Sequence, residues 1–125
     1  VTDPLPSPYK SLYILPMKVL MFRGGALNDL RAFPDLARRE AGYELDKLQN
    51  EQAPTDWKPM GTIGKGVQEI RIRDEVGAFR IIYVAKFAEA VYVLHCFQKK
   101  SQKTSRSDLD LAAKRYSDLV KELGQ

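Results

Sequence analysis

Three apolar segments in the second half of the chain restrict the fold more than any other feature of the sequence. They are VQEIRIR (67–73), GAFRIIYVAKF (77–87) and AVYVLHCF (90–97), and they are rich in the β-branched and aromatic residues that favour strands. The stretches between them are short, and none has room for a crossover helix. Strands joined by such short turns pair in an antiparallel meander. The sequence therefore predicts three consecutive antiparallel strands.

The segments on either side of these strands predict an α+β fold. MKVLMF (17–22) alternates into an apolar strand, and GGALNDL after it predicts a short helix. Residues 34–49 repeat apolar side chains at helical spacing, with Pro34 in the first turn. Ser107, with an acidic residue three positions later, predicts the start of a C-terminal helix. The expected order is βααβββα, with the helices packed on the sheet.

The first 16 residues differ in composition from the rest of the chain. VTDPLPSPYKSLYILP contains four prolines and no helical period, so we expect an irregular N-terminal extension over residues 1–16. The remaining residues, 17–125, have the length of one compact domain.

Scarce residue types exclude several kinds of chemistry. A single histidine, His95, excludes a nuclease that divides acid and base roles between two histidines, and it excludes most zinc sites. A single cysteine, Cys96, excludes a disulfide or a cysteine-based metal site within one chain. We therefore expect no metal and no other cofactor. The chain also lacks an apolar run of membrane-spanning length, so we expect no membrane partner and a cytoplasmic location.

The excess positive charge lies entirely in the second half of the chain. Residues 1–62 carry eight Lys and Arg against eight Asp and Glu, whereas residues 63–125 carry twelve against eight. Charged side chains alternate with isoleucines in VQEIRIRD, so one face of this strand is charged. Brought together, such cations would stabilise the transition state at a phosphate, with a tyrosine or a lysine moving protons. Kept apart, they would form only a solvated sheet face crossed by Glu–Arg pairs.

The order of these segments resembles a known family. The stretch EIRIRDEVGAFRIIYVAKFAEAVYVLHCFQKKSQKT, followed by a capped helix, is similar to the RelE/HigB superfamily of toxins from bacterial toxin–antitoxin systems, and to its phage-derived subfamily. The similarity extends upstream through DWKPMGTIGKG and covers residues 17 to about 121. The E-x-R strand, the F-R-x-x-Y strand and the L-H-x-F-x-K-K-x-x-K-T segment are jointly specific in this order and spacing.

The resemblance implies a fold and an activity. The fold is RelE-like, that is, microbial-ribonuclease-like, with a twisted antiparallel sheet. The activity is that of a toxin that inhibits translation as an mRNA endonuclease on the ribosome, without a metal, by attack of the 2′-hydroxyl on the adjacent phosphate. The implied partners are mRNA on the ribosome and an antitoxin protein encoded by the adjacent gene. The residues alone also allow a non-catalytic module of the same fold that binds RNA, the ribosome or a partner protein.

The candidate site residues follow from the cationic strands together with the resemblance. Our candidates for catalysis are Arg71, Arg80, Tyr83 and Lys99. Our candidates for RNA binding are Arg73, Lys100, Lys103 and Arg106.

Overall fold

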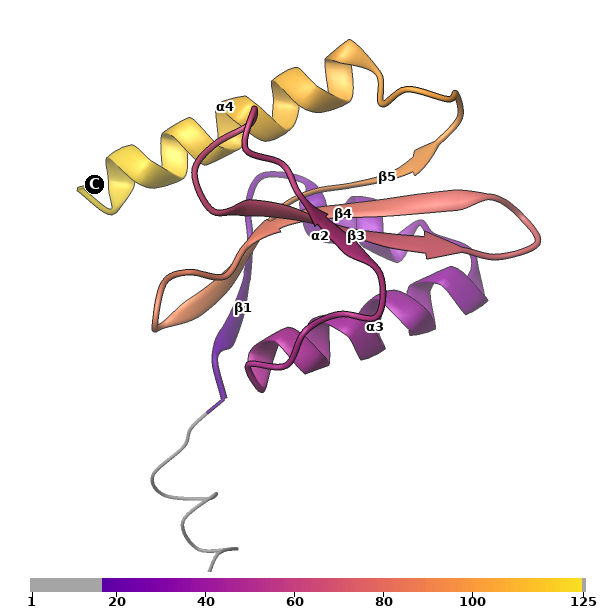
Figure 1. The fold of residues 1–125 in the computed structure, drawn as a ribbon, viewed down its shortest axis with the longest axis horizontal. Helices are drawn as coiled ribbons and strands as arrows, with labels where there is room; N and C mark the ends of the chain where they lie inside the picture. The colour runs from indigo at the N-terminus through magenta and orange to yellow at the C-terminus, as the bar shows by residue number, and fades with distance from the viewer. Residues whose placement is uncertain (1–16, 125) are drawn as a thin grey trace, which may run out of the picture.

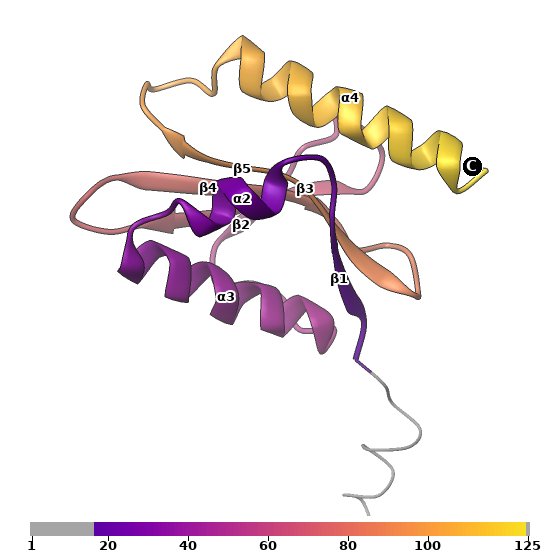
Figure 2. The same ribbon diagram turned by 180° about the vertical axis from the view of Figure 1, so that it is seen from behind.

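The computed structural model describes residues 17–124, which form one five-stranded sheet with helices on both faces (Figure 1 and Figure 2). In chain order the elements are β1 (Val19–Phe22), α2 (Ala26–Arg31), α3 (Asp35–Gln49), β2 (Trp57–Pro59), β3 (Val67–Arg73), β4 (Ala78–Val84), β5 (Ala90–Lys99) and α4 (Arg106–Glu122). This arrangement confirms the predicted α+β class. The predicted extension over residues 1–16 lies outside the described residues. Among the helices of residues 17–124, none combines the length and the apolar character needed to cross a membrane.

The predicted meander of three strands is confirmed. β3 pairs antiparallel with β4, and β4 pairs antiparallel with β5. Ile70 lies opposite Ile81, which in turn lies opposite Cys96, so apolar side chains from all three strands meet on one face. The register of β4 against β5 shifts once, between Ile82 and Tyr83.

The two edges of the sheet differ from the sequence prediction. The sheet is mixed, not purely antiparallel, because β1 runs parallel to β5 with Val19 opposite Ala90. The alternating apolar pattern of β1 is the same in either direction, so only the packing of the strand on the core decides its orientation. The strand β2 was not predicted, since it has three residues and includes Pro59. Proline is tolerated there because β2 is an outer strand of the sheet.

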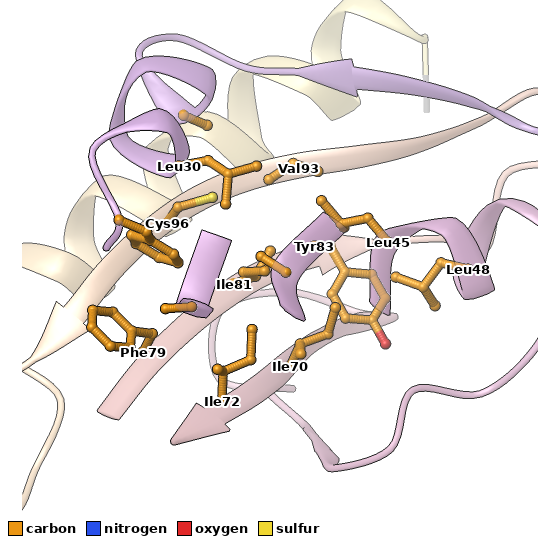
Figure 3. Packing of buried hydrophobic residues seen from close by; sticks show 14 of the residues in the cluster. Leu30, Leu45, Leu48, Ile70, Ile72, Phe79, Ile81, Tyr83, Val93 and Cys96 are labelled. Carbon is orange, nitrogen blue, oxygen red and sulfur yellow. The ribbon is translucent and has the colours of Figure 1, made fainter. Parts of the chain in front are cut away.

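Alternating side chains of the sheet form two apolar clusters, one on each face. Figure 1 shows the sheet between α4 on one side and α3 on the other. The cluster on the α3 side contains Ile70, Ile81 and Tyr83 (Figure 3). The cluster on the α4 side contains Ile82 and Leu94. Because helices cover both faces of the sheet, the charged side chains of Glu69 and Arg80 on its central strands are buried.

The C-terminal helix begins two residues earlier than the sequence predicts. The N-cap of α4 is Ser105, not Ser107: its Oγ accepts a hydrogen bond from the backbone N–H of Asp108 at 3.1 Å. Both serines are followed closely by aspartate, so the sequence pattern fits either start. Asp108 decides between them, because it also lies 2.7 Å from His95 Nε2 on β5 and so attaches the first turn of α4 to the sheet.

A buried carboxylate attaches the chain before β2 to α3. Glu44 of α3 is 1% exposed and accepts hydrogen bonds from the backbone N–H of Thr55 at 2.6 Å and from Thr55 Oγ1 at 2.8 Å. Burial raises the pKa of Glu44, but the hydrogen bonds from Thr55 and the charge of Lys47 outweigh it, and the net pKa lies below the ordinary value of 4.5. The carboxylate form therefore stabilises the folded state.

Glu44→Gln is expected to lower the free energy of unfolding at pH 7 by about 1–3 kcal/mol, because the two donors of Thr55 lose the charged acceptor that Glu44 provides. Since the pKa of Glu44 is lower in the folded chain, this stabilisation is present above the pKa of the unfolded chain and disappears as the pH falls through the folded-state pKa. Urea denaturation at pH 7 and pH 3.5 measures both effects. Glu40→Gln, at an exposed site on the same helix, is the control, and an equal loss in both variants would contradict the assignment.

Candidate functional site

A cleft with a volume of about 540 Å³ opens on the α4 side of β3 and β4. Residues 58–62 form one wall, and the segment between β5 and α4 forms the other. The chain between β2 and β3 rises toward α4 in Figure 1, and the Tyr116 hydroxyl of that helix donates to Lys65 O at 2.9 Å. The cleft is lined by Lys58, Pro59, Met60, Gly61, Thr62, Glu69, Arg71, Arg80, Lys99, Gln102, Lys103, Thr104 and Leu109. Five of these side chains are cationic and one is acidic, so the cleft is strongly positive.

The floor of the cleft is a carboxylate between two guanidinium groups. Arg71 of β3 lies directly opposite Arg80 of β4, and Glu69 lies two residues before Arg71 on the same face. Glu69 Oε1 is 3.5 Å from Arg71 Nε and 3.6 Å from Arg80 Nε. Two adjacent cations would repel each other, and the carboxylate offsets this repulsion.

Arg80 is a buried cation. It is 6% exposed, and its Nη1 donates to Phe79 O at 3.1 Å. Burial lowers the pKa of Arg80, Glu69 opposes this effect, and the nearby charges of Arg71 and Arg73 add to the lowering. Arginine still stays protonated in proteins, so the cleft contains a fixed positive charge that is poorly screened by water.

The two carboxylate oxygens of Glu69 have different surroundings. The side chain is 1% exposed and lines the cleft. Its Oε1 interacts with both arginines, whereas its buried Oε2 has no hydrogen-bond partner among residues 17–124. A buried polar atom without a partner is costly and rare in a folded protein, and a catalytic role is one explanation for it. The two arginines thus orient the Glu69 carboxylate at the floor of the cationic cleft, with one buried oxygen that makes no hydrogen bond.

Lysines from both walls surround this floor. Lys58 of β2 lies opposite Glu69 in the β2–β3 pairing, and Lys99 and Lys103 lie on the other wall. The Lys99 ammonium group donates to Gln102 O, which folds the start of the wall, and the Ser105 cap fixes its end. The lysines are therefore attached to ordered segments at both walls.

The structure brings together four of the eight predicted residues, namely Arg71, Arg80, Lys99 and Lys103. The three other cations lie elsewhere. Arg73 lines a groove beside α3, Lys100 lines a pocket beside α2, and Arg106 is exposed at the first turn of α4. Lys99 and Lys100 thus have different surroundings, because adjacent side chains along a strand point to opposite faces of the sheet.

Tyr83 is not part of the cleft, which corrects the sequence prediction. The side chain is fully buried in the cluster on the α3 side of the sheet (Figure 3), and its hydroxyl donates to Gln68 Oε1 at 2.7 Å. Burial raises the pKa of Tyr83 well above its ordinary value. Arg80 lies three residues earlier on the same strand, and an odd spacing places two side chains on opposite faces. Proton transfer in the cleft therefore needs another group.

Two charged residues of the cleft were missed in the sequence. Glu69 is visible in the alternating E-x-R pattern, but we interpreted it there only as a possible partner of an arginine. The signal that identifies Glu69 is an acidic residue on the charged face of a strand whose opposite face is apolar and buried. Lys58 has no such signal, because only the pairing of β2 with β3 brings it beside Glu69.

Comparison with known proteins places the chain in a family. Residues 28–117, well over half of the chain, match the family described as "Phage derived protein Gp49-like (DUF891)", and every residue that lines the cleft lies within this match. A search of curated proteins found no match. The matched family is toxin-like and is related to RelE-type toxins. The chain therefore belongs to the Gp49-like family of phage-derived proteins.

Proposed function

We propose that this protein is a RelE/HigB-type toxin that cleaves mRNA on the ribosome and so inhibits translation. The observation that carries the proposal is the oriented carboxylate of Glu69 on a cleft floor between Arg71 and Arg80, with lysines on both walls. The membership of a toxin-like family supports the same activity. The proposed partners are mRNA on the ribosome and an antitoxin from the adjacent gene, and the proposed location is the cytoplasm, where translation occurs.

The proposed chemistry is a phosphoryl transfer within the RNA. Glu69 accepts the proton of the 2′-hydroxyl, whose oxygen attacks the adjacent phosphorus. The bond from phosphorus to the 5′-oxygen breaks, and this oxygen takes a proton from a lysine ammonium group or from water. The products are a 2′,3′-cyclic phosphate and a free 5′-hydroxyl. A general base contributes about 10²–10⁴-fold to the rate in such reactions.

The cations of the cleft stabilise the charge that develops on the phosphate. Arg71 and Arg80 lie side by side on the floor and are able to donate to two non-bridging oxygens. Because Arg80 is buried, its charge acts with little screening by water or salt. The ribosome adds what the small cleft lacks, namely the positioning of the 2′-hydroxyl in line with the leaving oxygen.

Lys99→Ala is expected to slow cleavage by about tenfold to a hundredfold, the effect of losing one charge-assisted contact with phosphate. Lys100→Ala is expected to change the rate less than threefold, because Lys100 lies outside the cleft although it is adjacent in sequence. The measurement uses folded protein, purified free of antitoxin, with one transcript bound to programmed ribosomes and with the same transcript alone, and maps the new RNA ends over time.

Three results would contradict the proposal in different ways. An equal loss in both lysine variants would show that the cleft is not the site. Equal cutting of free and ribosome-bound transcript would refute ribosome dependence. No cutting of either transcript by folded wild-type protein would favour the non-catalytic binding module.

A further inference from the structure

The cleft has an apolar part beside its cationic part. Met60 of one wall and Leu109 of the other are half-buried and both line it, together with Pro59. The hydroxyl-bearing residues Thr62 and Thr104 line the same cleft, one from each wall. The cleft therefore offers non-polar side chains and hydroxyl-bearing residues from both walls, in addition to its cations. Phosphate alone would use only the cations and would leave this apolar part unoccupied.

The first wall of the cleft is preformed. The Met60 N–H donates to Val67 O at 2.8 Å, and Met60 also packs against the apolar cluster on the α4 side. Further along this wall, the Tyr116 ring lies so close to Gly64 that a Cβ atom there would be 2.2 Å from it. The loop after β2 is thus held against α4.

The second wall is equally well fixed. Leu109 lies in the first turn of α4, where its N–H donates to Ser105 O at 3.1 Å. The neighbouring Asp108 is within hydrogen-bonding distance of His95 on β5, and this contact attaches the turn to the sheet. Binding between two ordered walls costs little conformational entropy, as expected for a small-ligand site.

We infer that the apolar part is a nucleobase subsite, which takes the base of a nucleotide whose phosphate lies on Arg71 and Arg80. This inference rests on the proposed function and adds the class of substrate, an unpaired nucleotide. A base in this part of the cleft would contact the non-polar side chains of Met60 and Leu109, and its polar edge would have the threonine hydroxyls within the same cleft as partners. The volume of about 540 Å³ falls within the range of roughly 300–1,000 Å³ typical of pockets for ligands of this size.

An unpaired strand fits this geometry better than a duplex. A base in a duplex is stacked between its neighbours, and it has to leave the stack before it enters a gap between two walls. Proteins that recognise RNA by its bases accordingly bind single-stranded segments. Because threonine hydroxyls both donate and accept hydrogen bonds, the subsite accommodates more than one base.

The test compares ligands that share a phosphate but differ in the base. The folded wild-type protein is titrated by NMR at constant salt with inorganic phosphate, ribose 5-phosphate, adenosine 3′-monophosphate and cytidine 3′-monophosphate. The nucleotides are expected to bind about tenfold more tightly than either ligand without a base, because the base buries apolar surface. A single-stranded oligoribonucleotide should displace the nucleotide, whereas the same strand in a duplex should not.

Leu109→Ala and Met60→Ala are expected to remove most of this tenfold gain and to leave the affinity for inorganic phosphate unchanged. Val76→Ala is the matched control, since Val76 is an exposed apolar residue outside the cleft. Thermal unfolding confirms that each variant is folded. If one of the two variants does not fold, the other still tests the subsite.

The possible outcomes separate this inference from the proposed function. Nucleotides that bind no more tightly than phosphate, or an equal loss for phosphate and nucleotide in both variants, would refute the subsite even if the protein cleaves mRNA. Tighter binding of nucleotides that is lost in both variants would support the subsite even if the protein cleaves nothing on the ribosome.

Discussion

Glu69→Gln is expected to slow the cleavage of ribosome-bound mRNA by about 10²–10⁴-fold, the contribution of a general base. Glutamine keeps the shape of the side chain and an oxygen for the arginines, but it does not take a proton at neutral pH. Binding of RNA should persist or become tighter, because the variant removes the one negative charge of the cleft. The measurements are single-turnover cleavage on programmed ribosomes and binding of the same transcript.

The control for this variant is Glu75→Gln, an exposed carboxylate at the turn between β3 and β4. It makes the same chemical change outside the cleft and should leave the rate and growth arrest unaltered. Glu69→Gln protein that is folded and cleaves at the wild-type rate would show that Glu69 is not the base. Loss of RNA binding together with cleavage would instead assign Glu69 the role of orienting Arg71 and Arg80.

Arg80→Met is expected to lower the free energy of unfolding by about 3–5 kcal/mol, because it leaves the buried carboxylate of Glu69 without its buried partner. The loss should be smaller in the double variant Glu69→Gln with Arg80→Met, in which no charge remains fully buried on this floor. Both variants should be inactive. Urea denaturation of the two single variants and the double variant gives the coupling energy between the side chains.

Arg73→Met provides the comparison for this cycle, since Arg73 is exposed at the end of β3. Its effect on the free energy of unfolding should stay within about 0.5 kcal/mol. If the effects of the Glu69 and Arg80 substitutions were simply additive, the two side chains would not interact, and the description of the cleft floor as one ionic cluster would be wrong.

The features that the sequence predicts correctly are those encoded locally. The meander of β3, β4 and β5 follows from segments of β-branched residues with short turns between them, and α3 follows from an apolar repeat behind Pro34. The alternation of side chains even contains the correction for Tyr83, since a residue three positions from Arg80 on a strand faces the other way. Local geometry of this kind depends on few residues and is visible in their order.

The candidate site was predicted only in part for the same reason. Its cationic strands are visible as alternating residues, and Arg71 and Arg80 were named from them. That these two lie directly opposite each other depends on the strand register, which changes every contact when it shifts by one residue. The separation of Lys99 from Lys100 follows from the alternation of side chains along a strand, but only the structure shows that Lys99 is the one that faces the cleft.

The sequence by itself thus determined the α+β class, the three central strands and the charged face of β3. Only the tertiary structure decided that β1 runs parallel to β5, that Lys58 lies beside Glu69, and that Glu69 is buried with one oxygen uncommitted. These features are contacts between segments far apart in the chain, and their free energy comes from packing both faces of the sheet at once. A local pattern of residues does not contain that information, because the same pattern is compatible with several pairings until the core selects one.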